Sequence, residues 1–336
     1  MSWIDNMWYS PSWYHWPVIL LLLPLTALFW ALSWLRRTLF RLNIKASVDI
    51  PVPVIVVGNI SVGGNGKTPL VVYLAKRLRQ EGYHPGVLSR GYGGKNASYP
   101  MSVEPSSLVD LAGDEAILMR RHINCPLVVD PQRPRGALHL IDKHKCNVII
   151  CDDGLQHYAL NRDIEIVVMD GQRRCGNNIL LPAGPLREGT WRLKTADLLV
   201  LNGGLVTNGE HLMSLEAGQL INIKNPTKSL SLSRLTVPVT ALAAIGNPQR
   251  FFSLLQKKQV KIKKQLSFVD HHAFTEDDIP DGLVIMTEKD AVKCTHIAHD
   301  DCWYLPVSAS LTRQFESQLL QKLKHVAADK KPSKRK

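Results

Sequence analysis

The segment "VPVIVVGNISVGGNGKTPLVVYLAKRL", residues 52–78, decides the fold. Its first part, 52–58, is an apolar run typical of a buried strand, and residues 67–82 have the pattern of a helix that ends at a glycine. The glycine-rich turn between them resembles a phosphate-binding loop, although Ser61 stands at the first glycine of the usual Gly-x-x-x-x-Gly-Lys-Ser/Thr pattern. The segment is therefore either a nucleotide site or a turn that only resembles one.

The order of the elements favours the nucleotide site. Phosphate binding needs several backbone N–H groups, a helix N-terminus and a cation at one point, and a strand–turn–helix unit supplies them. The glycines that follow Ser61 offset the missing one, because they let the backbone approach the ligand. Lys67 would then reach the β- and γ-phosphates, and Thr68 would hold Mg²⁺. The predicted phosphate-binding residues are Gly63, Gly64, Asn65, Gly66, Lys67 and Thr68.

A second motif, "VIICDDG" (148–154), is an apolar strand that ends in two aspartates. Enzymes with a phosphate-binding loop hold their metal ion with a carboxylate at the carboxyl end of a neighbouring strand. A plain acidic turn is the alternative interpretation. Together with the loop, the motif predicts that Mg²⁺ is bound by Thr68 and by Asp152, Asp153 or both. The sequence does not decide which aspartate contacts the metal.

The rest of the chain extends this pattern into an α/β fold. Further apolar runs at 125–130, 146–153, 164–170 and 196–202 alternate with helical patterns, which is typical of a parallel sheet with helices on both faces. We predict a P-loop NTPase-like, doubly wound, mainly parallel sheet in a core of residues 51–235. A smaller second α/β lobe is expected at 236–328. The lysine-rich end, 329–336, is expected to be a disordered basic tail.

The N-terminus has the composition of a membrane anchor. Residues 6–35 contain no Asp, Glu, Lys or Arg, and residues 17–35 alone could cross a hydrocarbon core of ~30 Å at ~1.5 Å per residue. Six of the eight tryptophans lie in or beside this stretch, as interfacial anchors do. We predict an anchor at 1–35 and a basic connector at 36–50. Its arginines place the remaining chain on the cytoplasmic side by the positive-inside rule.

This stretch has three other interpretations. A cleaved signal peptide has a basic start, which this chain lacks. A buried core helix is the second alternative. A helix that lies along the surface remains open, because Pro24 can kink a spanning helix and the lead-in is rich in aromatic residues.

Composition narrows the class of partner. The formal net charge is +12, which favours a polyanionic partner such as nucleic acid, anionic lipid or a phosphorylated substrate. No nucleic-acid module is recognisable and the basic residues are dispersed, so we expect no nucleic acid. Six scattered cysteines without a C-x-x-C pair argue against a zinc site or a disulfide framework and fit a reducing compartment.

Six motifs besides the loop follow in order along the chain. They are "SRGYGG" (89–94), "GDEA" (113–116), "CDDGLQH" (151–157), "LPAGPLRE" (181–188), "DHHAF" (270–274) and "TEKDAVK" (287–293). With "GNISVGGNGKTP", this ordered set resembles the tetraacyldisaccharide 4′-kinase family, the lipid A 4′-kinases. The resemblance covers nearly the whole chain. Leu155 departs from it, because the family often has Phe after Asp-Asp-Gly, but the change is a conservative apolar one.

The resemblance implies a reaction and its partners. A kinase of this family transfers the γ-phosphate of ATP, with Mg²⁺, to the 4′-hydroxyl of an acylated glucosamine disaccharide 1-phosphate. The product, lipid IVA, is an intermediate of lipopolysaccharide. The resemblance therefore implies an enzyme on the cytoplasmic face of the bacterial inner membrane, N-terminally anchored and in contact with the inner leaflet. We expect a monomer.

The resemblance also implies roles for individual residues. Asp114 is the expected general base, oriented by His271, with His272 as the alternative partner. Lys67 and Arg187 are expected to neutralise the charge that develops on the transferred phosphoryl group. The residues expected to contact the substrate are Arg90, Tyr92, Gln156, His157 and Glu188. A membrane-bound nucleotide switch or transport ATPase subunit is the rival class; it would share the loop and the aspartates but has no need of "DHHAF".

Overall fold

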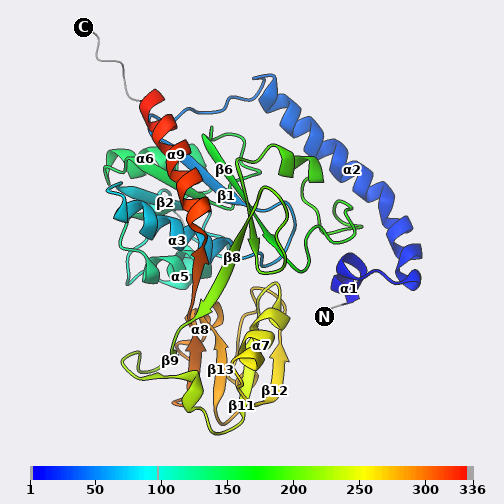
Figure 1. Ribbon diagram of the computed structural model, residues 1–336, viewed down its shortest axis with the longest axis vertical. Helices are drawn as coiled ribbons and strands as arrows, with labels where there is room; N and C mark the ends of the chain where they lie inside the picture. Colours follow the sequence, from blue (N-terminus) through cyan, green and yellow to red (C-terminus); the bar gives the residue numbers. More distant parts are fainter. Residues whose placement is uncertain (1–2, 97, 331–336) are drawn as a thin grey trace.

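Strand β1 (Val54–Gly58) lies near the middle of the larger lobe because both of its faces are apolar. Ile55 and Val57 pack into one buried cluster, and Val54 and Val56 pack into another on the opposite face. The computed structural model describes residues 3–96 and 98–330 and has two lobes arranged along its longest axis, with a long helix, α2, along one side (Figure 1).

The larger lobe contains a nine-stranded sheet of order β15-β8-β7-β6-β1-β5-β2-β4-β3. The strands from β8 to β4 run parallel, and β15 and β3 add antiparallel edges. Besides β1, the strands are β2 (Pro85–Ser89), β3 (Met101–Ser102), β4 (Leu127–Val129), β5 (Val148–Asp152), β6 (Ile164–Asp170), β7 (Leu198–Asn202), β8 (Glu210–Ala217) and β15 (Val307–Leu311).

Helices cover both faces of this sheet, which confirms the predicted doubly wound α/β fold. One cluster takes apolar side chains from α3 (Lys67–Gln80), α5 (Asp114–His122) and α9 (Arg313–Asp329). The cluster on the other face takes them from α6 (Arg133–Asp142). The short helices α4 (Val109–Ala112) and η2 (Thr190–Lys194) complete this lobe.

The smaller lobe contains a six-stranded sheet of order β10-β9-β14-β13-β11-β12. Its strands are β9 (Leu220–Asn222), β10 (Ser229–Leu230), β11 (Val239–Ala243), β12 (Ile262–Ser267), β13 (Val284–Thr287) and β14 (Cys302–Leu305). Its helices are α7 (Pro248–Lys257), α8 (Glu288–Cys294) and the 3-10 turns η3 (Leu232–Arg234) and η4 (Glu276–Asp278). Figure 1 shows this lobe below the larger one, with α8 near the junction between them.

The predicted boundaries of the second lobe, 236 and 328, need correction. Strands β9 and β10 already belong to the second sheet, so the smaller lobe begins near residue 220. At its other end, Pro306 separates β14 from β15, and β15 pairs with β8 of the first sheet. Helix α9 then packs on the larger lobe through Phe315, Leu319 and Leu323. The apolar run "CWYLPVS" (302–308) is therefore divided between two sheets.

The predicted boundary at residue 35, between the membrane anchor and the basic connector, also differs from the structure. Helix α1 (Trp3–Tyr9) and the turn η1 (Trp13–His15) precede α2 (Trp16–Arg41), so Arg36, Arg37 and Arg41 form the end of the long helix and not part of a connector. By length and composition α2 could cross a membrane. Only Ile19 and Thr26 of its side chains are buried.

The predicted disordered tail, 329–336, begins with two ordered residues. Asp329 ends α9, and the Lys330 ammonium group donates hydrogen bonds to the carbonyl oxygens of Ile50 and Val52 and to Asp163 Oδ2. Burying these carbonyl groups requires a donor, and Lys330 supplies it. The remainder of the predicted tail, 331–336, lies outside the described residues.

Candidate active site

The glycine-rich turn has the geometry of a phosphate-binding loop. It connects β1 to α3, and Gly63 and Gly66 have φ angles of 100° and 93°, which only glycine adopts without strain. Gly66 precedes Lys67, the first residue of α3, so the first N–H groups of that helix face the loop. A β-carbon at Gly66 would also lie 2.2 Å from Asn202 Nδ2 at the end of β7. The turn therefore leaves no room for a side chain at this point.

Ser61 causes no strain at the position of the missing glycine. Positive φ angles in the loop occur at Gly63 and Gly66 and not at Ser61, so no glycine is required there. The buried Ser61 hydroxyl accepts a hydrogen bond from Asn65 Nδ2 at 3.1 Å. Asn202 Nδ2 donates to the Asn65 carbonyl oxygen at 3.2 Å. These bonds hold the loop from both sides.

Lys67 and Arg187 converge on the second aspartate of the Asp-Asp pair. Lys67 Nζ lies 3.5 Å from Asp153 Oδ1, and an Arg187 guanidinium nitrogen lies 3.1 Å from the same oxygen. Arg187 is brought there because its backbone N–H donates to the Ile60 carbonyl oxygen at 2.7 Å, beside the loop. Burial raises the pKa of Asp153, but the charges of Lys67 and Arg187 together lower it by more. The pKa of Asp153 therefore lies below its ordinary value.

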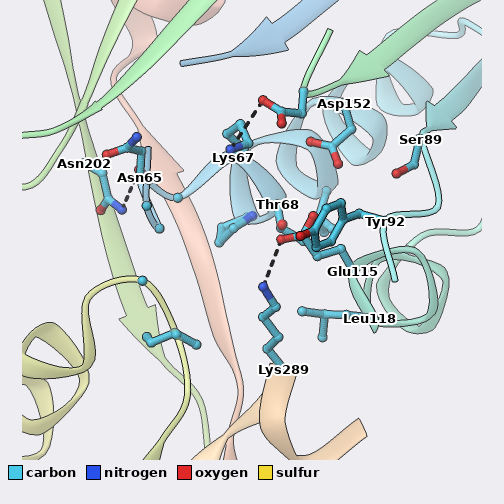
Figure 2. A pocket seen from close by; sticks show the side chains of 18 of the residues that line it. Asn65, Lys67, Thr68, Ser89, Tyr92, Glu115, Leu118, Asp152, Asn202 and Lys289 are labelled. Carbon is cyan, nitrogen blue, oxygen red and sulfur yellow. Dashed lines mark hydrogen bonds and ion pairs between the residues drawn. The ribbon is translucent and has the colours of Figure 1, made fainter. Parts of the chain in front are cut away.

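Asp152 has a different environment although it is the adjacent residue. It ends β5, is 2% exposed, and its Oδ1 atom has no hydrogen-bond partner among the described residues. Burial and the nearby carboxylates of Glu115 and Asp153 raise its pKa, and Lys67 opposes them. Figure 2 shows Asp152, Lys67 and Thr68 around the same space. An unpartnered buried carboxylate oxygen beside a threonine hydroxyl is the hard oxygen environment that Mg²⁺ prefers.

Asp114 and His271 meet across the two lobes. Asp114 is the first residue of α5 in the larger lobe, and His271 lies in the loop between β12 and η4 of the smaller lobe. His271 Nδ1 is 3.0 Å from Asp114 Oδ2. His272, the alternative partner, instead lies 3.1 Å from Asp278 Oδ2 and stacks on Phe268 within its own lobe. The sequence could not choose between the two histidines, and the geometry selects His271.

The ion pair shifts the pKa of both partners. Burial raises the pKa of Asp114, but the His271 hydrogen bond and the charge of Lys289 lower it below its ordinary value. The same hydrogen bond raises the pKa of His271, against the effect of burial and of Lys289. Asp114 is therefore a carboxylate at neutral pH, with a histidine ring that fixes its direction.

The predicted substrate-contact residues line one cavity of about 1240 Å³ with the loop. The Tyr92 ring centroid lies 4.8 Å from that of His271, and Arg90 is exposed beside it. Gln156 donates to the Asn59 carbonyl oxygen at 3.2 Å. Burial, with Arg133 and Arg90, lowers the pKa of His157 to about 4, so its ring is neutral at neutral pH.

Glu188 lines the cavity but is already bonded within the protein. Its carboxylate accepts hydrogen bonds from Arg192 Nε at 3.0 Å and from the Tyr158 hydroxyl at 3.1 Å, and it is 7% exposed. These contacts favour a structural role, which orients the chain after Arg187. Direct contact with the substrate remains a prediction.

Three residues near the site were not predicted. Arg133 is fully buried and donates to the Asp152 carbonyl oxygen at 2.7 Å, while its Nε and Nη1 atoms have no partner among the described residues. Asn202 holds the loop, and Lys289 extends from α8 toward Glu115 (Figure 2). Arg133 and Asn202 follow or end strands at the carboxyl edge of the sheet, where functional side chains gather, and that position was the available signal.

The same cavity extends from the phosphate-binding loop to α2, the helix that is long and apolar enough to cross a membrane. Its lining includes Phe29, Trp30 and Trp34 of α2 as well as Lys67 and Thr68. A nucleotide site and a strongly apolar helix therefore share one opening. This arrangement suits a reaction between a soluble nucleotide and a lipid.

A phosphate-binding loop with a helix N-terminus, a lysine, two strand-end carboxylates and a carboxylate–histidine pair defines a kinase that transfers a phosphoryl group to a hydroxyl. The profile of the family "Tetraacyldisaccharide-1-P 4′-kinase" matches residues 18–324. The chain belongs to this family, so it is an ATP-dependent kinase of lipid A synthesis.

Individual relatives agree with this assignment. The chain is 60% identical over 304 residues to the tetraacyldisaccharide 4′-kinase of Pseudoalteromonas atlantica, covering 90% of this chain and 100% of that protein. It is 47% identical over 332 residues to the enzyme of the same name from Shewanella frigidimarina, covering 98% and 97%. The solved structure of LpxK from Aquifex aeolicus in complex with ATP is similar with a TM-score of 0.75 and 29% identity, covering 92% of this chain and 99% of that one.

Proposed function

We propose that this chain transfers the γ-phosphate of ATP to the 4′-hydroxyl of tetraacyldisaccharide 1-phosphate, with Asp114 as the general base. The observation that carries this assignment is the Asp114–His271 pair, which joins the two lobes at the cavity that Lys67 and Thr68 also line. A sugar hydroxyl loses its proton poorly at neutral pH, so a nearby carboxylate raises the rate by accepting that proton.

The residues of the pair have separate roles. The Asp114 carboxylate, ionised at neutral pH, takes the proton of the 4′-hydroxyl as the oxygen attacks the γ-phosphorus. His271 donates from Nδ1 to Asp114 Oδ2, and the Glu115 backbone N–H donates to Asp114 Oδ1 at 2.8 Å, so both oxygens of the carboxylate are held in place. Because the partners come from different lobes, the base is complete only when the lobes are aligned.

Cations around the loop stabilise the phosphoryl group. Lys67 and Arg187 share the Asp153 carboxylate, and both reach the cavity, where their charge opposes that of the phosphates. The oxygen atoms of Thr68, Asp152 and Asp153 suit Mg²⁺, and the unpartnered Asp152 Oδ1 supports this assignment. When bound there, Mg²⁺ would neutralise charge on the phosphates.

The lipid is assigned to the end of the cavity that faces α2. Trp30 and Trp34 of α2 suit the acyl chains, and Arg90, Tyr92, Gln156 and His157 suit the disaccharide and its 1-phosphate. The exposed face of α2 supports attachment to the inner membrane, and Arg36, Arg37 and Arg41 at its end favour the cytoplasmic face. We propose that the enzyme acts there as a monomer.

A transfer assay tests the function. Full-length protein in detergent micelles is incubated with γ-³²P-ATP and with tetraacyldisaccharide 1-phosphate, RNA or no acceptor. Lipid-dependent formation of a labelled glycolipid is expected, with no labelled RNA. Release of inorganic phosphate at the same rate in all three samples would indicate a nucleotide switch or ATPase instead.

A further inference from the structure

Lys289 lies at the junction of the lobes and contacts both members of the Asp114–His271 pair. It belongs to the first turn of α8, whose N-cap Thr287 accepts a hydrogen bond from the Asp290 N–H. Its side chain is 14% exposed, although lysine is seldom buried without partners. The sequence motif "TEKDAVK" drew attention to this segment, but the proposed mechanism gives Lys289 no role.

Four polar groups surround the Lys289 ammonium group. Nζ lies 3.0 Å from Glu115 Oε1, 3.3 Å from Asp270 Oδ1, 3.4 Å from His271 Nε2 and 4.0 Å from Asp114 Oδ2. Glu115 and Asp114 belong to the larger lobe, and the other two belong to the loop of the smaller lobe. One cation therefore touches both members of the pair and the residue next to each of them.

These contacts assign the hydrogen atoms of the His271 ring. A neutral imidazole donates from one nitrogen and accepts at the other, and an ammonium group can only donate. In the neutral ring, which forms as the pH rises above the pKa of His271, Lys289 requires an accepting Nε2, so the ring hydrogen lies on Nδ1, the atom that faces Asp114. Without Lys289 the ring could turn or carry its hydrogen on Nε2, and Asp114 would lose its donor.

We propose that Lys289 is a positioning residue of the kinase reaction, which holds His271 as the Nδ1–H donor to Asp114. The inference rests on the proposed role of that pair. Lys289 acts through its contact with His271 Nε2. Its loss should lower kcat and leave KM for ATP nearly unchanged, because the loop around Lys67 is not altered.

The chain offers a matched control for general alignment of the lobes. His122 Nε2 of α5 lies 2.8 Å from Oε1 of Glu288, the residue of α8 that precedes Lys289. This contact joins the same two helices but does not involve Asp114 or His271. If Lys289 only held the lobes together, His122→Ala would cause a loss of similar size. If Lys289 acts through His271, the two variants should differ widely.

The experiment is a double-mutant cycle measured by label transfer from γ-³²P-ATP to tetraacyldisaccharide 1-phosphate with the full chain. Lys289→Met is expected to lower kcat about 30-fold or more with KM for ATP within about threefold, and His122→Ala to stay within about threefold of wild type. Lys289→Arg, which keeps the charge and the donors, should recover part of the loss. In a His271→Ala background Lys289→Met should have little further effect, because residues that act as a unit are not additive.

Three results would overturn the inference: near wild-type kcat for Lys289→Met, an undiminished effect in the His271→Ala background, or an equal loss in His122→Ala. Should Lys289→Met fail to give a cooperative melting transition, Lys289→Gln replaces it in the same cycle. Failure of the proposed role of the Asp114–His271 pair is distinguishable, because His271→Ala and Asp114→Asn would then themselves retain activity, and failure of the kinase function would leave wild type without lipid-dependent transfer. If Lys289→Met is active while His271→Ala and Asp114→Asn are inactive, only the proposed role of Lys289 is refuted.

Discussion

Asp152 and Asp153 are neighbours with the same side chain, yet their surroundings give them different properties. Asp153 is neutralised by Lys67 and Arg187, which lower its pKa. Asp152 lines the same cavity with an oxygen, Oδ1, that has no hydrogen-bond partner in the described part of the chain, and burial raises its pKa. Lys67 thus compensates an internal carboxylate until phosphates occupy the loop. Lys67 therefore links the phosphate-binding loop to the carboxylates at the end of β5.

Lys67→Ala tests this link. The variant should fold, because the Lys67 side chain lies at the cavity surface. Its kcat should fall by about two orders of magnitude or more, because the positive charge that neutralises the transferred phosphoryl group is lost. Transfer of label to the lipid measures kcat, and a thermal melt checks the fold. Turnover within about tenfold of wild type would remove Lys67 from the reaction.

At the scale of elements, the site depends on two contacts between the lobes. One is the pair of Asp114 on α5 and His271 in the loop before η4. The other joins the phosphate-binding loop to the turn before α7, where a β-carbon at Gly246 would lie 2.2 Å from the Gly64 nitrogen. Arg173 also donates to the Gly246 carbonyl oxygen at 2.8 Å. Both contacts place the smaller lobe directly on catalytic elements.

The first contact should make stability depend on pH. The pKa of His271 is raised above its ordinary 6.5, so its pairing contributes fully below pH 6.5 and is lost as pH rises through the raised value. The pKa of Asp114 is lowered from 3.8, so its contribution is present above that value.

Melting temperatures of wild type and His271→Ala should therefore differ more at about pH 5.5 than at about pH 8.5. Replacement of the exposed His296 by Ala is the control and should give no such trend. A difference that grows as the pH rises would show that His271 is not held as the cationic partner of Asp114.

The second contact predicts the effect of Gly246→Ala. The added methyl group would collide with the backbone of Gly64, so the loop or the lobe must shift by a few tenths of an ångström or more. KM for ATP is expected to rise about tenfold, since loop N–H groups bind the phosphates. Binding of ATP measured by calorimetry checks the change, and unaltered affinity would mean that the smaller lobe does not support the loop.

At the scale of the whole molecule, α2 and the two lobes surround one opening. Figure 1 shows α2 along the side of the larger lobe, with α1 at its start. Met7, Ile19 and Ala183 form a small buried cluster, and the Thr26 hydroxyl accepts a hydrogen bond from the Ala183 N–H at 3.2 Å. The helix is thus attached to the segment that leads to Arg187, while most of its surface stays exposed.

Deletion of residues 1–35 tests the anchor. The shortened protein is expected in the soluble fraction after lysis, with a lower melting temperature because the cluster at Ala183 is uncovered. A second variant, with Arg36, Arg37 and Arg41 changed to Gln, keeps the apolar helix and should stay with membranes. Sedimentation of the deletion variant with membranes would show that basic residues outside the helix are the main attachment.

The sequence was sufficient where a short pattern determines local geometry. The strand–loop–helix around Lys67 and the strand that ends at Asp152 follow from residues within a few positions of each other. It was insufficient where distant segments meet. Tertiary packing that no local pattern records determines the return of β15 and α9 to the larger lobe and the choice of His271 over His272. It also determines the contacts of the buried Arg133 and of the half-buried Lys289.

The most direct test of the proposed mechanism is a single-turnover measurement with Asp114→Asn. Enzyme in excess over γ-³²P-ATP is mixed with saturating tetraacyldisaccharide 1-phosphate, and labelled lipid is quantified over time. The rate of transfer should fall by about two orders of magnitude or more, with ATP affinity close to wild type, because the amide keeps the shape of the carboxylate but cannot accept the hydroxyl proton. A transfer rate within a few-fold of wild type would contradict the assignment of Asp114 as the base.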